Sequence, residues 1–237
     1  MNDVAIFYMC FDHRSNEPEW QELVRFLPEN LQETVNKQYH WQDRFRKAAG
    51  KLILFYSLEK LGYVDYDPEM LQADENGRPY LSDCVDFNIT HSGNYIICSI
   101  SKEGRIGVDV EYTQPVNLQE FRHILNDKEW NWVVNSSNPN RRFYHLWTLK
   151  ESAAKVDGKG IFIPFQSLEI DHQQIAYGTN RWYFKNLALD EEHVAYITAE
   201  KPFGQFEVCE VGLEEVKTFA LKQTTVRKLA SNNNEYI

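Results

Sequence analysis

The chain has 237 residues and a net charge of −10, from 25 lysine and arginine side chains against 35 aspartate and glutamate side chains. This length is enough for a buried core without disulfides or a structural metal. The 43% hydrophobic and 25% charged content is that of an ordered globular protein. The negative charge excludes a protein that coats DNA or RNA, because such proteins need basic faces. A local basic patch for a small anionic ligand is compatible with it.

The four cysteines are scattered and show no CxxC spacing. This spacing gives no recognisable zinc site and no disulfide framework. The N-terminal residues lack a basic segment followed by a long apolar stretch, so we expect no secretory signal. The apolar runs fall far short of the ~20 residues that a membrane-spanning helix needs. We therefore expect a cytoplasmic protein with reduced thiols, without a membrane or nucleic-acid partner.

The first 112 residues are predicted to run from a strand through helices to further strands. The apolar, aromatic segment 4–9 favours a buried strand. The longest predicted helix has Phe45, Ala49, Leu52 and Tyr56 on one face, at helical spacing. The helices are expected at 17–27 and 42–61, and the strands at 4–9, 85–90, 95–101 and 105–112.

The remaining residues repeat this order, with helices followed by strands. The helices are expected at 127–135 and 141–156, and the strands at 167–171, 181–187, 193–200 and 205–211, with a polar tail after 230. Helices segregated from strand meanders predict an α+β fold, and the repetition predicts two similar halves that meet near residue 106. We place the N-terminal half at 1–105 and the C-terminal half at 106–237. Because no Pro/Ser-rich linker separates them, we expect the halves to pack tightly.

Two carboxylates stand on one face of the predicted strand at 105–112. Asp109 and Glu111 alternate with Val108 and Val110, so both carboxylates project together, about 6–7 Å apart at their Cβ atoms. The apolar residues point to the opposite face, into a core. Two carboxylates on a rigid strand make a partial shell for Mg²⁺, a hard ion that also binds water and phosphate oxygens. The alternative is a solvated acidic strand face.

A second candidate is the stripe of Trp147, Glu151 and Lys155, spaced by four residues on the predicted helix 141–156. Glu151 is suited to bind a metal or accept a proton, and Lys155 to neutralise a leaving phosphate. The alternative is a surface salt bridge worth a few tenths of a kcal/mol.

Phosphate-binding side chains are predicted at two further places. Asn88, Thr90, His91 and Ser92 gather at the end of a predicted strand and can donate several hydrogen bonds. The alternatives are a structural histidine and a plain turn at Ser92. In addition, basic residues dominate 37–51, where a phosphorylated ligand or a solvated helix face would explain them. They are Lys37, Arg44, Arg46, Lys47 and Lys51, against one acid, Asp43.

Arg78 adds a cation on the turn that Gly77 and Pro79 form. It is either a ligand contact or an ordinary exposed turn residue. The chain has no GxSxG, HExxH, P-loop or GxGxxG motif, so none of these mechanisms is indicated.

Four motifs occur in a fixed order and together form a specific pattern: NGRP (76–79), FNITHS (87–92), GVDVE (107–111) and WTLKESAAK (147–155). This pattern resembles the 4′-phosphopantetheinyl transferases, and their longer Sfp-type branch in particular, over roughly residues 20–170. The resemblance implies a pseudo-twofold monomer of two α+β halves. It also implies transfer of the phosphopantetheine arm from coenzyme A to a serine of an apo carrier protein, with adenosine 3′,5′-bisphosphate as by-product.

The resemblance also implies roles for individual residues. Asp109, Glu111 and Glu151 match the Mg²⁺ ligands, Glu151 the base that acts on the carrier serine, and Lys155 the acid for the leaving group. The implied coenzyme A contacts are Arg46, Arg78, Thr90 and His91, which places those contacts in the N-terminal half and the metal and catalytic residues in the C-terminal half. Glu129 matches an acidic position near the family's metal site, with a role left open.

The chain departs from the family pattern where lysines often contact the 3′-phosphate, because Leu31 and Thr34 stand there. Lys47, with Lys37, is the candidate replacement.

Two other functions compete with the transferase: a silent module that binds coenzyme A or carrier proteins, and a Mg²⁺-dependent nucleotide hydrolase. A silent module has no reason to keep Asp109, Glu111, Glu151 and Lys155, and the hydrolase lacks an obvious base separate from the metal shell. The carrier itself, whether peptidyl, polyketide or acyl, is left open.

Overall fold

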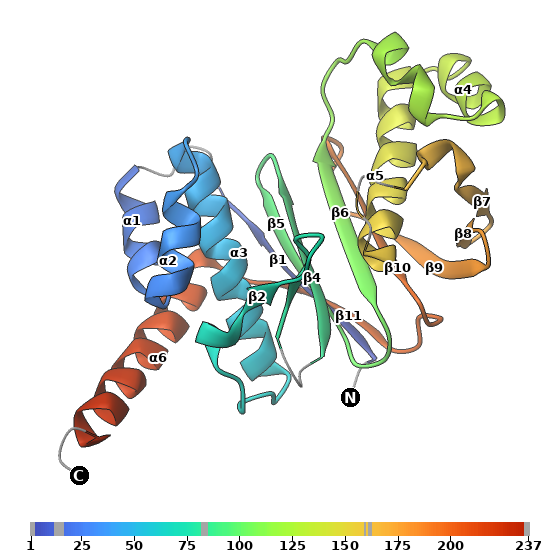
Figure 1. The fold of residues 1–237 in the computed structure, drawn as a ribbon. Coiled ribbons are helices and arrows are strands. Elements are labelled where there is room, and N and C mark those ends of the chain that lie inside the picture. Colours follow the sequence, from blue (N-terminus) through green and yellow to red (C-terminus); the bar gives the residue numbers. More distant parts are fainter. Residues whose placement is uncertain (1–2, 12–16, 82–84, 159, 161–162, 235–237) are drawn as a thin grey trace.

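The computed structural model describes residues 3–11, 17–81, 85–158, 160 and 163–234. Within them, the strands form two main sheets, and a long helix packs against each (Figure 1). The α-helices are α1 (Glu17–Arg25), α2 (Glu29–Asn36), α3 (Trp41–Lys60), α4 (Asp127–Val134), α5 (Pro139–Asp157) and α6 (Leu213–Asn234). Short 3₁₀ helices are η1 (Pro68–Met70), η2 (Leu118–Ile124) and η4 (Phe165–Ser167).

The first sheet has the strand order β11-β1-β5-β4, and the second has the order β6-β10-β9-β8-β7. The strands of the first are β1 (Val4–Cys10), β4 (Asp86–Ser92), β5 (Tyr95–Ser101) and β11 (Phe206–Glu210). Those of the second are β6 (Ile106–Tyr112), β7 (Glu169–Asp171), β8 (Gln174–Tyr177), β9 (Asn180–Leu187) and β10 (His193–Ala199). A small ribbon joins β2 (Gln72–Ala73) to β3 (Pro79–Tyr80). The predicted α+β class with two halves is confirmed.

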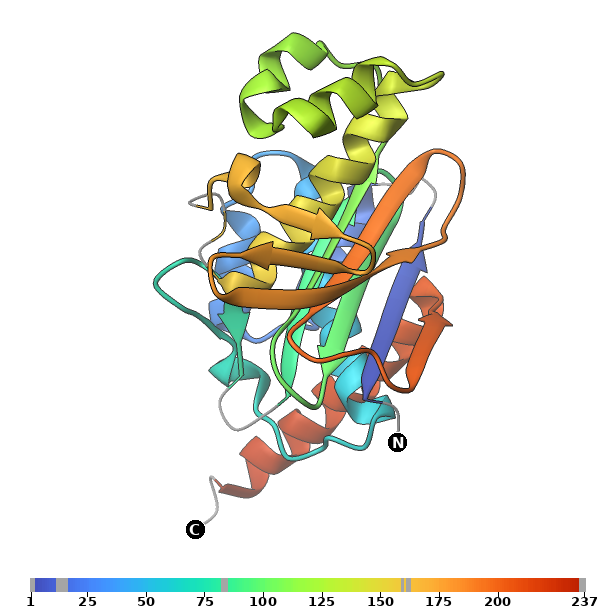
Figure 2. The same ribbon diagram turned by 90° about the vertical axis from the view of Figure 1, so that its right-hand side faces the viewer.

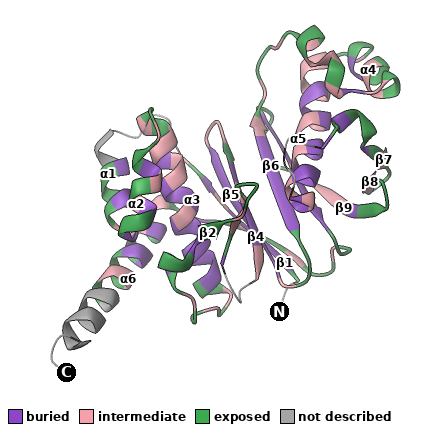
Figure 3. Cartoon of the chain, in the orientation of Figure 1, coloured by how far each residue is buried: buried purple, intermediate pink, exposed green. Residues whose placement is uncertain are grey.

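The central strands of the first sheet, β1 and β5, are buried on both faces, which is why they are apolar at most positions. On one face, Ala5 and Phe7 join the core that α1, α2 and α3 cover. On the other face, Val4 and Ile6 join Ile106 and the rest of a second core, between the two sheets. Alternate residues of one strand thus enter different cores. Figure 3 shows this burial along the central strands. The predicted inward face of Val108 and Val110 is confirmed by their place in that second core.

At the seam between the halves, β4 and β6 lie side by side without a backbone ladder among the described strands (Figure 1). Side chains at alternate positions of β4 accept the hydrogen bonds that a neighbouring strand would otherwise take. These bonds run from Ile106 N to Asp86 Oδ2 (2.7 Å), from Val108 N to Asn88 Oδ1 (3.0 Å) and from Tyr112 N to Ser92 Oγ (3.0 Å). The seam therefore fixes β6 relative to β4 while keeping the buried backbone amides satisfied.

After residue 205 the chain packs against the N-terminal half. β11 pairs in parallel with β1, with Val4 opposite Phe206, and Figure 2 shows the two strands together. The following helix α6 packs against the N-terminal core through Val216, Phe219 and Ala220. We predicted neither α6 nor β8. Most of α6 is polar, so its apolar spacing is confined to one short stretch, and β8 is only four residues long.

Two close approaches depend on glycine. A Cβ atom at Gly50 of α3 would come 3.1 Å from Ile89 Cγ2 of β4, so α3 packs closely on the first sheet. A Cβ atom at Gly107 of β6 would come 2.2 Å from the Ser152 backbone oxygen of α5. Real Cβ atoms do not come as close as 2.2 Å to another atom, and the Ser152 backbone oxygen cannot rotate away as a side chain could.

We therefore expect Gly107→Ala to push α5 away from β6. The expected loss is about 1–3 kcal/mol of unfolding free energy, as for other overpacked cores. Transfer activity should fall as well, because the shift separates Glu151 and Lys155 on α5 from Asp109 on β6. Urea unfolding and single-turnover transfer measure the two effects. A matched Gly212→Ala control has no atom within 4 Å of its Cβ, and normal stability in both variants would contradict the account.

Among the residues that the structure describes, every helix is too short or too polar to cross a lipid bilayer. Cys10, Cys98 and Cys209 are free thiols, and Cys84 lies outside the described residues.

Candidate active site

The predicted acidic residues meet at the seam, where β6 lies between β4 and α5. Asp109 is 5% exposed. Its Oδ1 accepts hydrogen bonds from Lys155 Nζ at 2.7 Å and from Thr90 Oγ1 at 3.2 Å. Its Oδ2 is buried and has no hydrogen-bond partner among the described residues. Burial raises the pKa of Asp109, and the Lys155 ammonium opposes that rise.

Glu111 is held at both carboxylate oxygens. Trp147 Nε1 of α5 donates to Oε1 at 3.2 Å, and Ser92 Oγ of β4 donates to Oε2 at 3.1 Å. Burial, and then repulsion from Asp109, raises the pKa of Glu111. The sequence predicts Trp147 on the stripe of Glu151 and Lys155 without a role, and Ser92 at a phosphate. The structure shows both orienting Glu111.

Glu151 completes the acidic group from α5. Its carboxylate makes no hydrogen bond to the described residues, and its pKa is raised to about 7. Burial is the largest cause, followed by repulsion from Asp109, while Lys155 opposes the rise and Glu111 adds to it. The three carboxylates therefore repel one another across a shared space. A cation in that space would relieve this repulsion.

The described residues contain no ready-made metal-binding arrangement of three histidine, cysteine, aspartate or glutamate side chains. The donor chemistry nevertheless suits a hard cation, since it offers three carboxylates and the unpartnered Oδ2 of Asp109.

Lys155 lies one turn beyond Glu151, close to the end of α5. Its Nζ donates to the Val108 backbone oxygen at 2.9 Å as well as to Asp109. The side chain is 26% exposed, so it is partly accessible from solvent. The Glu151–Lys155 pair is therefore not a plain surface salt bridge, because Lys155 contacts Asp109 instead.

Arg46 and His91 lie together beside the turn between β4 and β5. Arg46 donates to Asp43 Oδ1 at 3.1 Å and to the Gly93 backbone oxygen at 3.3 Å, and its Nε is buried without a partner among the described residues. The His91 side chain is reached by solvent, yet protein surrounds it on most sides. Burial, and then the positive charges of Arg46 and Lys155, lowers the pKa of His91. Arg46 and Lys155 therefore place positive charge close to His91.

Arg78 is buried at the seam and links the elements on its two sides, with a side chain that is 8% exposed. Its guanidinium binds Asp86 Oδ2 at 2.6 Å and the Ile106 backbone oxygen at 2.9 Å, and also the Lys155 backbone oxygen. Beside it, Arg78, Asn88 and Lys155 help to line a pocket of about 260 Å³. Arg78 thus shapes a space next to Lys155 while its charge is taken up by protein acceptors.

Lys47 and Lys51 form one stripe of α3 and are both half-buried. Their spacing of four residues places the two amines on the same side of the helix. Burial, and then repulsion from Lys47, lowers the pKa of Lys51 to about 8. Lys51 belonged to the basic cluster of the sequence but was not singled out, because only the fold shows its burial.

Two sequence candidates have structural partners away from the acidic group. Glu129 closes the capping box of α4 with Asn126, and its Oε2 accepts from Lys150 Nζ at 2.7 Å. Lys150 is completely buried and also donates to the Phe165 backbone oxygen. Asn88 accepts a hydrogen bond from the Val108 backbone amide at the seam. These contacts hold the elements around the site together.

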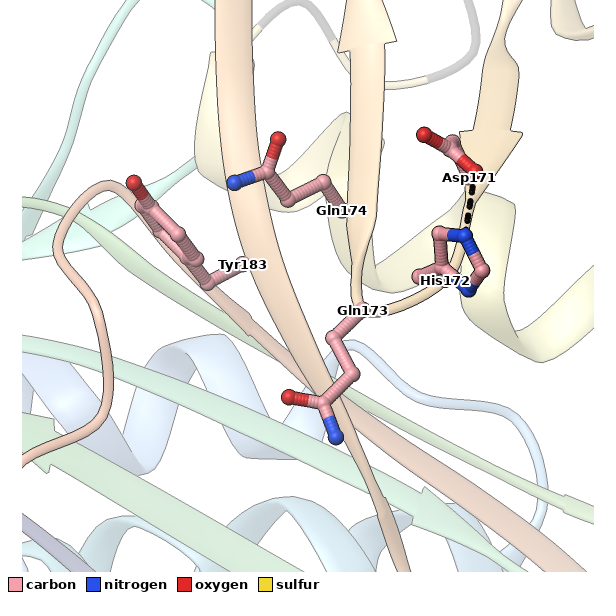
Figure 4. Close-up of a pocket in the computed structure, with 5 residues that line it drawn as sticks. All are labelled: Asp171, His172, Gln173, Gln174 and Tyr183. Carbon is pink, nitrogen blue, oxygen red and sulfur yellow. Dashed lines mark ion pairs between the residues drawn. The ribbon is translucent and has the colours of Figure 1, made fainter.

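A larger hollow of about 600 Å³ lies on the β7–β8 hairpin and β9 (Figure 4). Its lining includes the exposed Asp171–His172 pair at the tip of the hairpin, with 3.5 Å between Oδ1 and Nε2. None of the predicted site residues lines it.

Two family models match the chain in its two halves. The model described as 4′-phosphopantetheinyl transferase superfamily covers residues 105–223, and the one described as 4′-phosphopantetheinyl transferase, N-terminal, covers residues 13–103. The chain belongs to the 4′-phosphopantetheinyl transferase superfamily. It transfers the phosphopantetheine arm of coenzyme A to carrier proteins.

Individual relatives agree with this assignment and with the Sfp-type branch. The 4′-phosphopantetheinyl transferase Sfp of Bacillus subtilis (strain 168) is 25% identical over 90% of this chain and 100% of its own length. The 4′-phosphopantetheinyl transferase gsp of Aneurinibacillus migulanus is 27% identical over 70% of this chain and 72% of its own. The L-aminoadipate-semialdehyde dehydrogenase-phosphopantetheinyl transferase of Xenopus laevis is 23% identical over 93% and 84%. These relatives do not favour the alternative function of a non-catalytic binding module.

Proposed function

We propose that Asp109, Glu111 and Glu151 bind Mg²⁺ in this transferase, with Glu151 and Lys155 as its base and acid. The observation that carries the proposal is the group of three mutually repelling carboxylates beside one ammonium group at the seam. Bound Mg²⁺ would neutralise charge on the pyrophosphate of coenzyme A as the P–O bond breaks.

Glu151 is suited to accept the proton of the carrier serine. Without a bound metal the pKa of Glu151 is raised to about 7. A bound cation would keep the carboxylate ionised and so able to accept a proton. Lys155 is suited to give a proton to the leaving adenosine 3′,5′-bisphosphate. Its contacts to Asp109 and the Val108 backbone hold the ammonium at a fixed place while part of it stays exposed.

The coenzyme A phosphates are proposed to lie against Arg46, Lys47, Thr90, His91 and Arg78. Arg78 would act mainly by shaping the pocket beside Lys155, because its own charge is already paired. The Lys47 ammonium, on the same helix face, repels that of Lys51 and contributes to the lowered pKa of Lys51. A phosphate group bound between them would relieve that repulsion, which supports adding Lys51 next to Lys47 as a 3′-phosphate contact.

Lys51→Gln is therefore expected to weaken coenzyme A binding about tenfold at low salt. It should leave 3′-dephospho-coenzyme A nearly unaffected. Added salt should reduce the difference in coenzyme A affinity between wild type and Lys51→Gln, because salt screens exposed charges. Calorimetry on both ligands measures this, with Lys60→Gln as a control that removes a half-exposed lysine of the same helix. Equal wild-type affinities for the two ligands would remove the 3′-phosphate site from α3.

We also propose that the protein acts as a monomer, since one chain supplies both sides of the seam. The N-terminal half, residues 1–105, would hold the coenzyme A phosphates, and 106–237 the metal and catalytic groups. β11 and α6 pack on the N-terminal sheet and tie the halves together. The carrier is a peptidyl, polyketide or acyl carrier protein.

Mass spectrometry of apo carriers tests the proposed chemistry. Incubation with the protein, coenzyme A and Mg²⁺ should add one phosphopantetheine group to the carrier, and excess chelator should abolish this gain until Mg²⁺ is restored. Full transfer in chelator would contradict the metal assignment. Cleaved coenzyme A with an unmodified carrier would favour the hydrolase instead.

Metal affinity should depend on pH through Glu151. Because its folded-state pKa is raised to about 7, the carboxylate is mostly protonated at pH 6, and a proton competes with the metal. We expect Mg²⁺ to bind about tenfold more tightly at pH 8 than at pH 6, with release of about one proton at the lower pH. Calorimetry in buffers of different ionisation enthalpy measures both quantities. A pH-independent affinity would exclude Glu151 as a ligand.

A further inference from the structure

A pocket of about 460 Å³ lies between α4, α5 and the strands β7, β9 and β10. It lies on the other side of α5 from the proposed catalytic residues. At 3.6 residues per turn, Leu146 and Leu149, which line it, point roughly opposite to Glu151 and Lys155. None of the residues proposed above for catalysis, metal binding or coenzyme A binding lines it.

The walls of the pocket are mainly apolar and aromatic. Leu146 and Leu149 are 8% and 4% exposed, and the rings of Phe184 and Tyr196 lie 6.0 Å apart at their centroids. Trp132 of α4 stands at the rim, 46% exposed, with the Arg142 guanidinium 4.1 Å from its ring centroid. Size and lining are those of small-molecule sites, which are mostly apolar with a few placed polar groups.

The polar groups of the pocket favour an anion. His145 Nδ1 lies 3.1 Å from Tyr196 OH, which leaves its other ring nitrogen without a protein partner among the described residues. Lys128 is exposed at the pocket and forms no ion pair within the described part of the chain, whereas Glu129 is neutralised by Lys150. Arg142 lies above Trp132, so Lys128 and Arg142 supply two positive charges at this edge of a chain with net charge −10.

We propose that this pocket is a second ligand site that binds a small aromatic carboxylate. The ring would lie against the wall that includes Trp132, Phe184 and Tyr196, and the carboxylate would lie at Lys128. A planar ring suits the aromatic wall better than a flexible chain does, because little conformational freedom is lost on binding. This inference concerns binding alone and is independent of the catalytic assignments.

Calorimetry with 2-naphthoate and its neutral analogue 2-naphthamide tests the site on the full chain. We expect saturable binding of one naphthoate. Trp132→Ala should weaken both probes about three- to tenfold. Lys128→Gln should weaken naphthoate alone, about two- to fivefold, and Lys222→Gln, an exposed lysine of α6, should change nothing. Both site residues are exposed, so these variants should fold normally, which circular dichroism checks.

Competition with coenzyme A separates this pocket from the active site. Saturating coenzyme A should leave naphthoate affinity unchanged. Displacement of naphthoate by coenzyme A would overturn the proposal, because the probe would then lie in the catalytic cleft. Absence of saturable binding, or equal binding in wild type and both site variants, would overturn it as well.

Discussion

Asp109→Asn is expected to reduce phosphopantetheine transfer by at least about 10²–10³-fold while the fold stays intact. The amide keeps the size of the side chain and can still accept the hydrogen bond from Lys155. It cannot supply the negative charge that a hard cation requires. Because burial already disfavours the ionised carboxylate, its neutral replacement should change unfolding free energy by at most about 1 kcal/mol.

Single-turnover transfer, urea unfolding and Mn²⁺ calorimetry on Asp109→Asn separate function from stability. Asp190→Asn is the matched control, because Asp190 lies outside the acidic group and its Oδ1 contacts Nδ1 of the buried His193 at 2.9 Å. That control should lose stability and keep transfer. Transfer near the wild-type rate in Asp109→Asn, with unchanged metal affinity, would remove Asp109 from the site.

Lys155→Met is expected to lower the transfer rate about 10²–10⁴-fold, the usual contribution of a general acid. It should also destabilise the metal-free protein, because buried Asp109 would lose its only cationic partner among the described residues. Mg²⁺ should restore that stability, since it would supply the missing positive charge and binds only the folded state.

The predicted signature is therefore a larger Mg²⁺-induced stabilisation in Lys155→Met than in wild type, measured by urea unfolding with and without Mg²⁺. Lys185→Met is the control for replacing a lysine by methionine outside the site, because Lys185 contacts the aromatic rings of Phe203 and Phe206. An equal Mg²⁺ effect in wild type and Lys155→Met would show that metal and ammonium do not share Asp109.

The main elements and the acidic centre could be predicted from sequence because strong periodicities encode them. Strand alternation placed Asp109 and Glu111 on one face and Val108 and Val110 in the core, and helical spacing placed Glu151 and Lys155 together. Helix α3 was predicted at 42–61 and is found at Trp41–Lys60.

The partners of these residues could not be predicted, because they depend on how the halves meet. Ser92 and Asn88 carry the same sequence signal as a phosphate-binding loop, yet they bond across the seam to β6. Arg78 likewise stands in a sequence typical of an exposed turn, yet its side chain is buried and paired with Asp86 at the seam. The helix α6 escaped prediction because its polar composition resembles a tail.

The most direct test of the account is a crystal structure with coenzyme A and Mn²⁺, examined by anomalous scattering. The account predicts one anomalous peak within coordination distance of Asp109, Glu111 and Glu151, beside the pyrophosphate, with Lys155 next to the leaving phosphate. A peak bound elsewhere, or bound coenzyme A with Lys155 still paired to Asp109 and no metal between the carboxylates, would contradict it.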